Sequence, residues 1–130
     1  MKINHKILAD SHYICDLKTS QLRIIDDNDI PWFLLIPMYE NISELTDLEF
    51  DIQKDILKDI NIVSNVLKSN IKIDKLNIAS IGNIVSQLHI HIIGRNKSDR
   101  CWPSTIWGSK TQNKLSEQNI QFWKEKFKLK

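Results

Sequence analysis

Apolar positions in this chain fall into several short runs and one long periodic stretch, a pattern that predicts a sheet packed against helices. Residues His12–Leu17 and Gln21–Asp26 are rich in β-branched and aromatic side chains and are predicted to be two strands joined by a tight polar connection. Trp32–Ile36 is a continuous apolar run closed by Pro37, which is typical of a central strand buried on both faces. Two later runs complete the set of expected strands: Lys75–Ile81 and Gln87–Arg95.

The strongest helical signal covers Asp47–Ser69. Apolar residues recur there at spacings of three or four and form one stripe along the predicted helix: Leu48, Ile52, Ile56, Ile60, Val63 and Leu67. Thr46 and Glu49 have the spacing of a capping box at its start. A short helix is expected over Ile3–Ala9, and Ser116 is expected to cap a last helix.

Strands come in groups along the chain instead of alternating strictly with helices. This order favours an α+β domain with a mainly antiparallel sheet. The 130 residues suit one domain, 1–130, that buries a single core without disulfide bonds. Hydrophobic residues make up 42% and charged residues 26%, which is an ordinary balance for a globular protein.

Charge and sequence ends limit the partners and the compartment. The formal net charge of +2 is small and no basic patch is interleaved with aromatic residues, so we expect no nucleic-acid partner. The first ten residues lack the apolar core of a signal peptide, and no apolar run approaches the ~20 residues of a membrane span. Cys15 and Cys101 have no metal-ligand spacing and are expected to be reduced thiols. We therefore expect a cytoplasmic protein with no membrane partner.

The candidate chemistry lies in the strand predicted at Gln87–Arg95. Because side chains on a strand alternate between its faces, Gln87, His89 and His91 are expected on one face and apolar residues on the other. Histidine ionises near neutral pH and can therefore serve as nucleophile, base or acid. A polar surface strand without any catalytic role remains the alternative at this point.

Metal binding is a further alternative for the same pair of histidines. Two imidazoles on one strand face can hold a divalent ion if another element supplies a third ligand. Four side chains are candidates for that third ligand, none of them with a spacing signature: His5, His12, Asp26 and Asp27.

A longer motif surrounds the histidines. Gly82 and Asn83 lead into Gln-Leu-His-Ile-His at 87–91, and the strand at 32–36 ends in an apolar-Ile-Pro step. Asp99, Trp102-Pro103 and Trp107-Gly108 follow downstream. Together these residues resemble the signature of the histidine-triad (HIT) superfamily. The Gln-x-His-x-His and Trp-Pro motifs are similar to those of a bacterial, diadenosine polyphosphate hydrolase-like subgroup.

The resemblance implies a HIT-like five-stranded antiparallel sheet with one long helix and a C-terminal helix. It also implies a homodimer with a continuous sheet. The implied activity is hydrolysis or transfer at the α-phosphorus of a nucleotide, such as a dinucleoside polyphosphate, a nucleoside phosphoramidate or an acyl-nucleotide, without a metal or other cofactor. His89 is then the nucleophile that forms a nucleotidyl-histidine, His91 donates to a non-bridging oxygen, and Gln87 donates an amide hydrogen bond.

The resemblance assigns further residues to substrate binding. Asn83 stands where the family has a phosphate-holding glutamine, and Gly82 lets the backbone approach the ligand. Asp26 is expected to bind ribose hydroxyls, with a plain turn residue as the alternative. Trp102 is expected to cover the pocket of its own chain or of a partner, with packing of the tail on the domain as the alternative. Arg95 and Arg100 could neutralise phosphate, but arginines in such positions are more often plain surface charges, and this is expected for both.

The chain departs from the family pattern at several positions. Gln87 replaces the first histidine of the triad, and Pro37-Met38-Tyr39-Glu40 replaces a Pro-Lys-x-His step. These changes affect protonation of the leaving group and the choice of substrate. A non-catalytic nucleotide-binding module with the same fold is therefore the second hypothesis.

Overall fold

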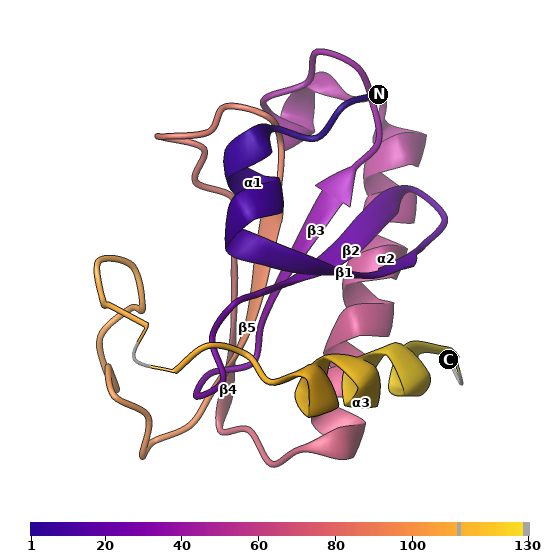
Figure 1. Ribbon diagram of the computed structural model, residues 1–130. Coiled ribbons are helices and arrows are strands. Elements are labelled where there is room, and N and C mark those ends of the chain that lie inside the picture. Colours follow the sequence, from indigo (N-terminus) through magenta and orange to yellow (C-terminus); the bar gives the residue numbers. More distant parts are fainter. Residues whose placement is uncertain (112, 129–130) are drawn as a thin grey trace.

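The computed structural model describes residues 1–111 and 113–128, and within them five strands form one antiparallel sheet in the order β1-β2-β3-β5-β4 (Figure 1). The strands are β1 (Ser11–Asp16), β2 (Ser20–Ile25), β3 (Trp32–Pro37), β4 (Lys75–Ala79) and β5 (Ile90–Arg95). Every neighbouring pair in the sheet is antiparallel. The predicted α+β class with a five-stranded antiparallel sheet is confirmed.

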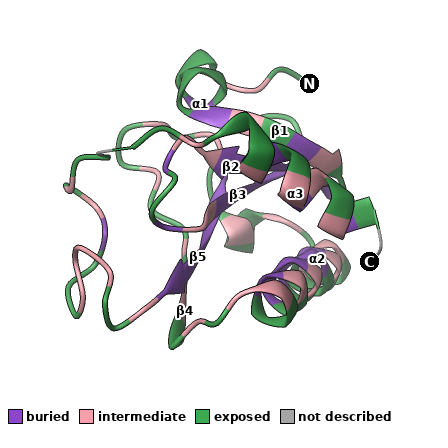
Figure 2. Cartoon of the chain, turned by 60° about the horizontal axis from the view of Figure 1, so that its bottom comes forward, coloured by how far each residue is buried: buried purple, intermediate pink, exposed green. Residues whose placement is uncertain are grey.

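Helices cover the two faces of this sheet unequally. The long α2 (Phe50–Asn70) and the C-terminal α3 (Glu117–Lys128) pack on one face, whereas the short α1 (His5–Asp10) lies on the other. Figure 2 shows the buried strands beside α2 and α3, whose outward surfaces are exposed. In the described part of the chain, no helix is both long and apolar enough to cross a membrane.

The central strand β3 is buried on both faces, as its unbroken apolar run predicts. Phe33 and Leu35 belong to the main core with α2 and α3, while Leu34 and Ile36 pack with Ile7 of α1. The alternation of a pleated strand thus divides one apolar run between two cores. The aromatic ring of Phe33 meets that of Trp123 on α3 edge to face, with 5.2 Å between ring centroids.

The start of α2 differs from the prediction. The capping box of Thr46 and Glu49 is wrong, because Leu45–Asp47 forms a separate 3-10 turn and Glu49 caps α2 without a side-chain hydrogen bond. The side-chain amide of Gln53 instead donates to the backbone oxygen of Leu48 at 2.8 Å. The predicted cap of α3 is present, since Ser116 Oγ accepts the backbone N–H of Asn119 at 3.1 Å.

Two buried ion pairs hold the irregular segment between β5 and α3 against the sheet. Arg95 donates from Nε to Asp99 at 2.8 Å, and Arg100 donates from Nη2 to Asp27 at 2.7 Å. The expectation that both arginines are surface charges is therefore wrong. Asp99 also accepts three backbone N–H groups, at 96, 101 and 102. These bonds, with the ion pair first, hold the pKa of Asp99 well below its usual range.

We predict that Asp99→Asn lowers the free energy of unfolding by about 3 kcal/mol, because it leaves the buried Arg95 charge without its partner. The carboxyl with a lowered pKa stabilises the fold above the unfolded pKa of about 3.9, and this contribution is lost as pH falls below it. Urea unfolding at pH 7 and near pH 3 measures both effects. The exposed Asp51→Asn is the control, and equal losses in the two variants would contradict the prediction.

Candidate functional site

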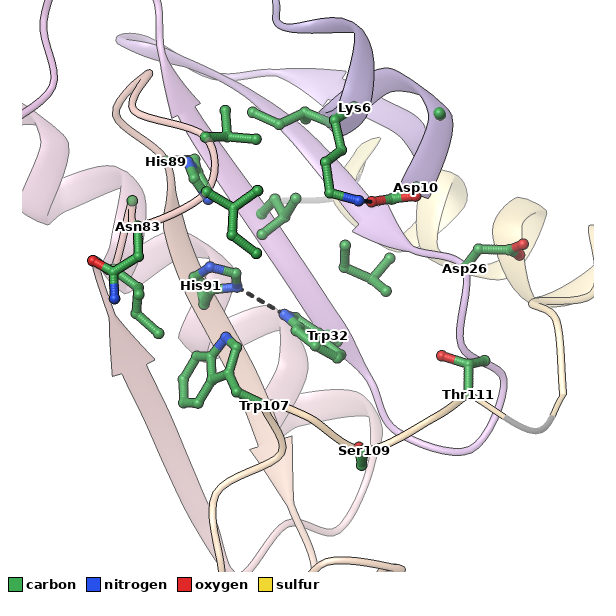
Figure 3. A pocket seen from close by; sticks show the side chains of 18 of the residues that line it. Lys6, Asp10, Asp26, Trp32, Asn83, His89, His91, Trp107, Ser109 and Thr111 are labelled. Carbon is green, nitrogen blue, oxygen red and sulfur yellow. Dashed lines mark hydrogen bonds and ion pairs between the residues drawn. The ribbon is translucent and has the colours of Figure 1, made fainter.

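A cavity of about 920 Å³ opens on the face of the sheet that carries α1. Its walls come from α1, the end of β2, β3, the segment before β5, β5 itself and the tail after it: Lys6, Ile7, Ala9, Asp10, Ile25, Asp26, Trp32, Leu34, Ile81, Gly82, Asn83, Ile84, Val85, His89, His91, Trp107, Ser109, Thr111 and Lys114. Figure 3 shows His89 and His91 on one side of this cavity and Asp26 on the other. The volume is typical of small-molecule sites.

His89 lies immediately before β5, and its imidazole is held by the backbone of Gln87. Its Nδ1 lies 2.7 Å from the carbonyl oxygen of Gln87. Because a carbonyl oxygen can only accept, Nδ1 carries the hydrogen of this bond. In the neutral ring, Nε2 therefore keeps its lone pair. The side chain is mostly buried yet lines the cavity, so it can reach a bound ligand.

His91 follows on β5, with its ring centroid 5.1 Å from that of His89. Trp32 of β3 donates its indole N–H to His91 Nδ1 at 2.9 Å, the dashed line in Figure 3. The ring of Trp107 meets His91 nearly at a right angle, with centroids 5.3 Å apart. Burial, and secondarily the neighbouring His89, lowers the pKa of His91 to about 4. His91 is therefore a neutral imidazole at pH 7.

Asp26 follows β2, away from the two histidines (Figure 3). Its Oδ1 lies 3.0 Å from His12 Nε2 and accepts the backbone N–H of Leu115 at 3.0 Å. The hydrogen bond with His12 is the main cause of a lowered pKa for Asp26. The carboxylate is therefore an anionic hydrogen-bond acceptor at this end of the cavity.

The wall beside the histidines is formed by an irregular segment that contains Gly82 and Asn83. Gly82 has φ of +69°, a left-handed conformation that side-chain-bearing residues rarely adopt. This backbone turn places the exposed Asn83 at the cavity, where its amide can donate to a ligand oxygen. Both residues line the cavity together with His89 and His91.

The structure does not bring two of the predicted site residues into the cavity. The side chain of Gln87 accepts the backbone N–H of Asn4 at 2.8 Å and donates to the backbone oxygen of Lys2 at 3.0 Å. It lines a second hollow, so the expected stripe of three polar side chains is wrong at its first member. Trp102 is also outside the cavity and packs under Arg95, whose guanidinium carbon is 5.8 Å from the ring centroid.

Sequence reasoning missed two aromatic residues that complete the site. The apolar run at 32–36 predicts that Trp32 belongs to a buried core strand, yet its side chain lines the cavity beside His91. Trp32 and Leu34 are two residues apart on β3, so their side chains lie on the same face of the strand. This spacing is the signal that places Trp32 on the cavity face. Trp107 appears in the Trp-Gly motif, but nothing in its spacing indicates a contact with His91.

The same cavity gives no grouping suited to a metal ion. No set of three or more His, Cys, Asp or Glu side chains among residues 1–111 and 113–128 is arranged to hold one. Of the third ligands considered, His12 pairs with Asp26, and Asp27 pairs with Arg100. The geometry thus does not favour the metal-binding alternative.

The sequence pattern that defines the HIT domain matches residues 8–98 of this chain. The chain belongs to the HIT domain family. The matched range contains both cavity histidines of this HIT protein and most of the cavity wall, but neither Lys6 and Ile7 of α1 nor the tail that carries Trp107. The predicted superfamily is thereby confirmed.

Solved structures of other HIT proteins agree with this fold. A histidine triad protein from Bradyrhizobium japonicum is 35% identical, with a TM-score of 0.93 over 99% of this chain and 96% of its own. One from Sinorhizobium meliloti is 29% identical, with a TM-score of 0.93 over 98% and 95%. One from Marinobacter aquaeolei is 28% identical, with a TM-score of 0.92 over 98% and 93%. No curated protein of known role matches the sequence.

We predict that Gln87→Ala lowers the free energy of unfolding by about 1 kcal/mol, because it removes two hydrogen bonds to the N-terminal segment. The variant keeps the carbonyl that binds His89, so the imidazole NMR signals of His89 and His91 should stay in place. Urea unfolding and ring NMR spectra measure the two effects. Shifted imidazole signals at unchanged stability would place the Gln87 side chain in the site after all.

Proposed function

We propose that this HIT protein is a nucleotide hydrolase or transferase that acts at the α-phosphorus through a nucleotidyl-histidine intermediate. HIT proteins bind nucleotides, which supports the ligand class. The observation that carries the proposal is the bond from His89 Nδ1 to the Gln87 carbonyl, because it leaves an imidazole lone pair at the cavity. Dinucleoside polyphosphates, including diadenosine polyphosphates, nucleoside phosphoramidates and acyl-nucleotides are the candidate substrates.

The chemistry divides one displacement into two steps. His89 Nε2 attacks the α-phosphorus with its lone pair, the P–N bond forms, and the bond to the leaving group breaks with its electron pair. Water then attacks the same phosphorus, the P–N bond breaks to return the electron pair to His89 Nε2, and the proton lost by the water passes to solvent. Each step needs positioning and charge stabilisation more than it needs further covalent groups.

The other side chains of the cavity stabilise charge and bind the nucleoside. Neutral His91 donates a hydrogen bond to a non-bridging oxygen as negative charge builds up, and Asn83 adds a second donor. The Asp26 carboxylate accepts hydrogen bonds from ribose hydroxyls. The apolar wall of Ile25 and Leu34 offers a surface for the base. We assign the chemistry to His89 and His91, and give the side chain of Gln87 no part in it.

A non-catalytic nucleotide-binding module is the second candidate. The replacement of the triad's first histidine by Gln87 favours it, because the side chain at that position is bound to backbone groups of the N-terminal segment. Such a module binds a nucleoside monophosphate but forms no covalent adduct. The two candidates therefore differ in a measurable bond.

We predict that His89→Ala reduces nucleotide turnover by on the order of 10⁴-fold or more, because the nucleophile is lost. Intact-mass spectrometry after rapid quenching should show a nucleoside monophosphate adduct on the unmodified protein, and peptide mapping should place it on His89. The adduct should be absent from His89→Ala.

Two control variants make this test specific. His5→Ala removes an exposed histidine of α1 that does not line the cavity, and Cys15→Ser removes a thiol of β1. Both should keep turnover and the adduct. Full turnover by His89→Ala would reject the nucleophile, whereas binding without turnover or adduct in every protein would favour the non-catalytic module.

We also infer a homodimer in which β4 of two chains pairs across the edge of the sheet. β4 is an edge strand in the described sheet, and Ile78 on it is 49% exposed. Pairing would satisfy the outward backbone groups of the strand and cover that side chain.

We predict a light-scattering mass near twice the 15.2 kDa of one chain. Ile78→Lys should shift the mass toward that of the monomer, because it buries a charge in the proposed interface. Tyr13→Lys changes an exposed residue on β1, the other edge strand, and should leave the mass unchanged. A monomeric mass for the unmodified protein would reject the inferred dimer.

A further inference from the structure

The hydrogen bond between Trp32 and His91 has a direction that the chemistry of the two rings dictates. An indole N–H is a donor and has no acceptor nitrogen. Its Nε1 lies 2.9 Å from His91 Nδ1, so Nδ1 must be the acceptor. In a neutral imidazole, one nitrogen accepts and the other carries the proton, and the proton of His91 is therefore on Nε2.

The two cavity histidines consequently have opposite tautomers. The carbonyl of Gln87 requires the proton of His89 on Nδ1, whereas the indole of Trp32 requires the proton of His91 on Nε2. One ring then presents a lone pair at its remaining nitrogen and the other presents an N–H. A nucleophile and a donor to an anionic oxygen need these two opposite states.

We propose that Trp32 is a positioning residue that fixes His91 as an Nε2–H donor toward the phosphate oxygens of the substrate. This role rests on the proposed function, because it names what His91 must present to an anion. Without the indole donor, His91 can place its proton on Nδ1. Its Nε2 lone pair would then face a negatively charged oxygen and repel it.

The surroundings of His91 keep this arrangement in place. Trp32 is the first residue of β3 and Leu34, two residues on, is directly opposite His91 in the β3–β5 register. The indole therefore reaches His91 from the neighbouring strand. Trp107 packs against both rings, 6.4 Å from Trp32 and 5.3 Å from His91 between centroids. Burial also keeps the His91 ring neutral, and only a neutral ring has an accepting Nδ1.

The test is ¹⁵N NMR of the imidazole rings in the ligand-free protein at pH 7. The expected His91 spectrum has an unprotonated, pyridine-type Nδ1 and a protonated, pyrrole-type Nε2, and His89 has the reverse. In Trp32→Phe, the His91 signals should move toward the other tautomer or an average of the two. Trp107→Phe removes an indole from the same ring cluster without removing the hydrogen bond, so it should keep the His91 pattern.

Turnover supplies the second readout. Trp32→Phe should lower kcat and kcat/KM together by about tenfold, which corresponds to one hydrogen bond made in the transition state. A larger effect on KM with unchanged kcat would indicate a role in binding the ground state and would contradict the proposal.

These measurements separate the two proposals. A protonated Nδ1 on His91 in the unmodified protein overturns the positioning role even if turnover is normal. An unchanged His91 pattern in Trp32→Phe overturns it as well. Absence of turnover in the unmodified protein, with the expected tautomers in place, rejects the proposed enzyme and not the tautomer assignment.

Discussion

The antiparallel register of β3 and β5 is the constraint on which the site depends. It pairs Leu34 with His91, so the cavity faces of the two strands coincide. The opposite faces of the same strands supply Phe33, Ile90 and Ile92 to the core under α2. A register shift of one residue would move the side chains on each face of these strands to the opposite face, and it would place the histidines in that apolar core. The packing of α2 thus fixes which face the histidines occupy.

The second determinant is the segment after β5, which forms no helix or strand within its described residues before α3 and is ordered by buried charge. Arg95 joins Asp99, the carbonyl of Ser104 and the ring of Trp102, and Arg100 joins Asp27 in the connection between β2 and β3. Such pairs cost free energy to desolvate, so their main effect is to favour one conformation of this segment over other conformations. In the conformation that these ion pairs favour, Trp107 contacts His91.

The periodicity of the sequence predicted which faces of the strands and of the long helix are buried. The unbroken run of β3, the apolar stripe of α2 and the two-residue spacing of His89 and His91 all describe which face meets the core, and each agrees with the structure. It did not predict contacts between segments distant in sequence. Gln87 is turned to the N-terminal segment by partners 83 and 85 residues away, and Arg95 bonds Asn77 on β4, 18 residues away. Neither group of contacts produces a periodic pattern in the sequence.

The same limit explains why the spacing of two identical side chains does not reveal where each carries its proton. His89 and His91 are both imidazoles two residues apart, and spacing alone assigns neither a proton. The difference comes from what each Nδ1 meets: a backbone carbonyl within the same segment for His89, and an indole from the neighbouring strand for His91. A carbonyl can only accept and an indole N–H can only donate, so the two environments demand opposite tautomers. The loop before β5 and the register of β3 therefore decide which histidine presents a lone pair and which presents an N–H, the difference that the proposed reaction requires.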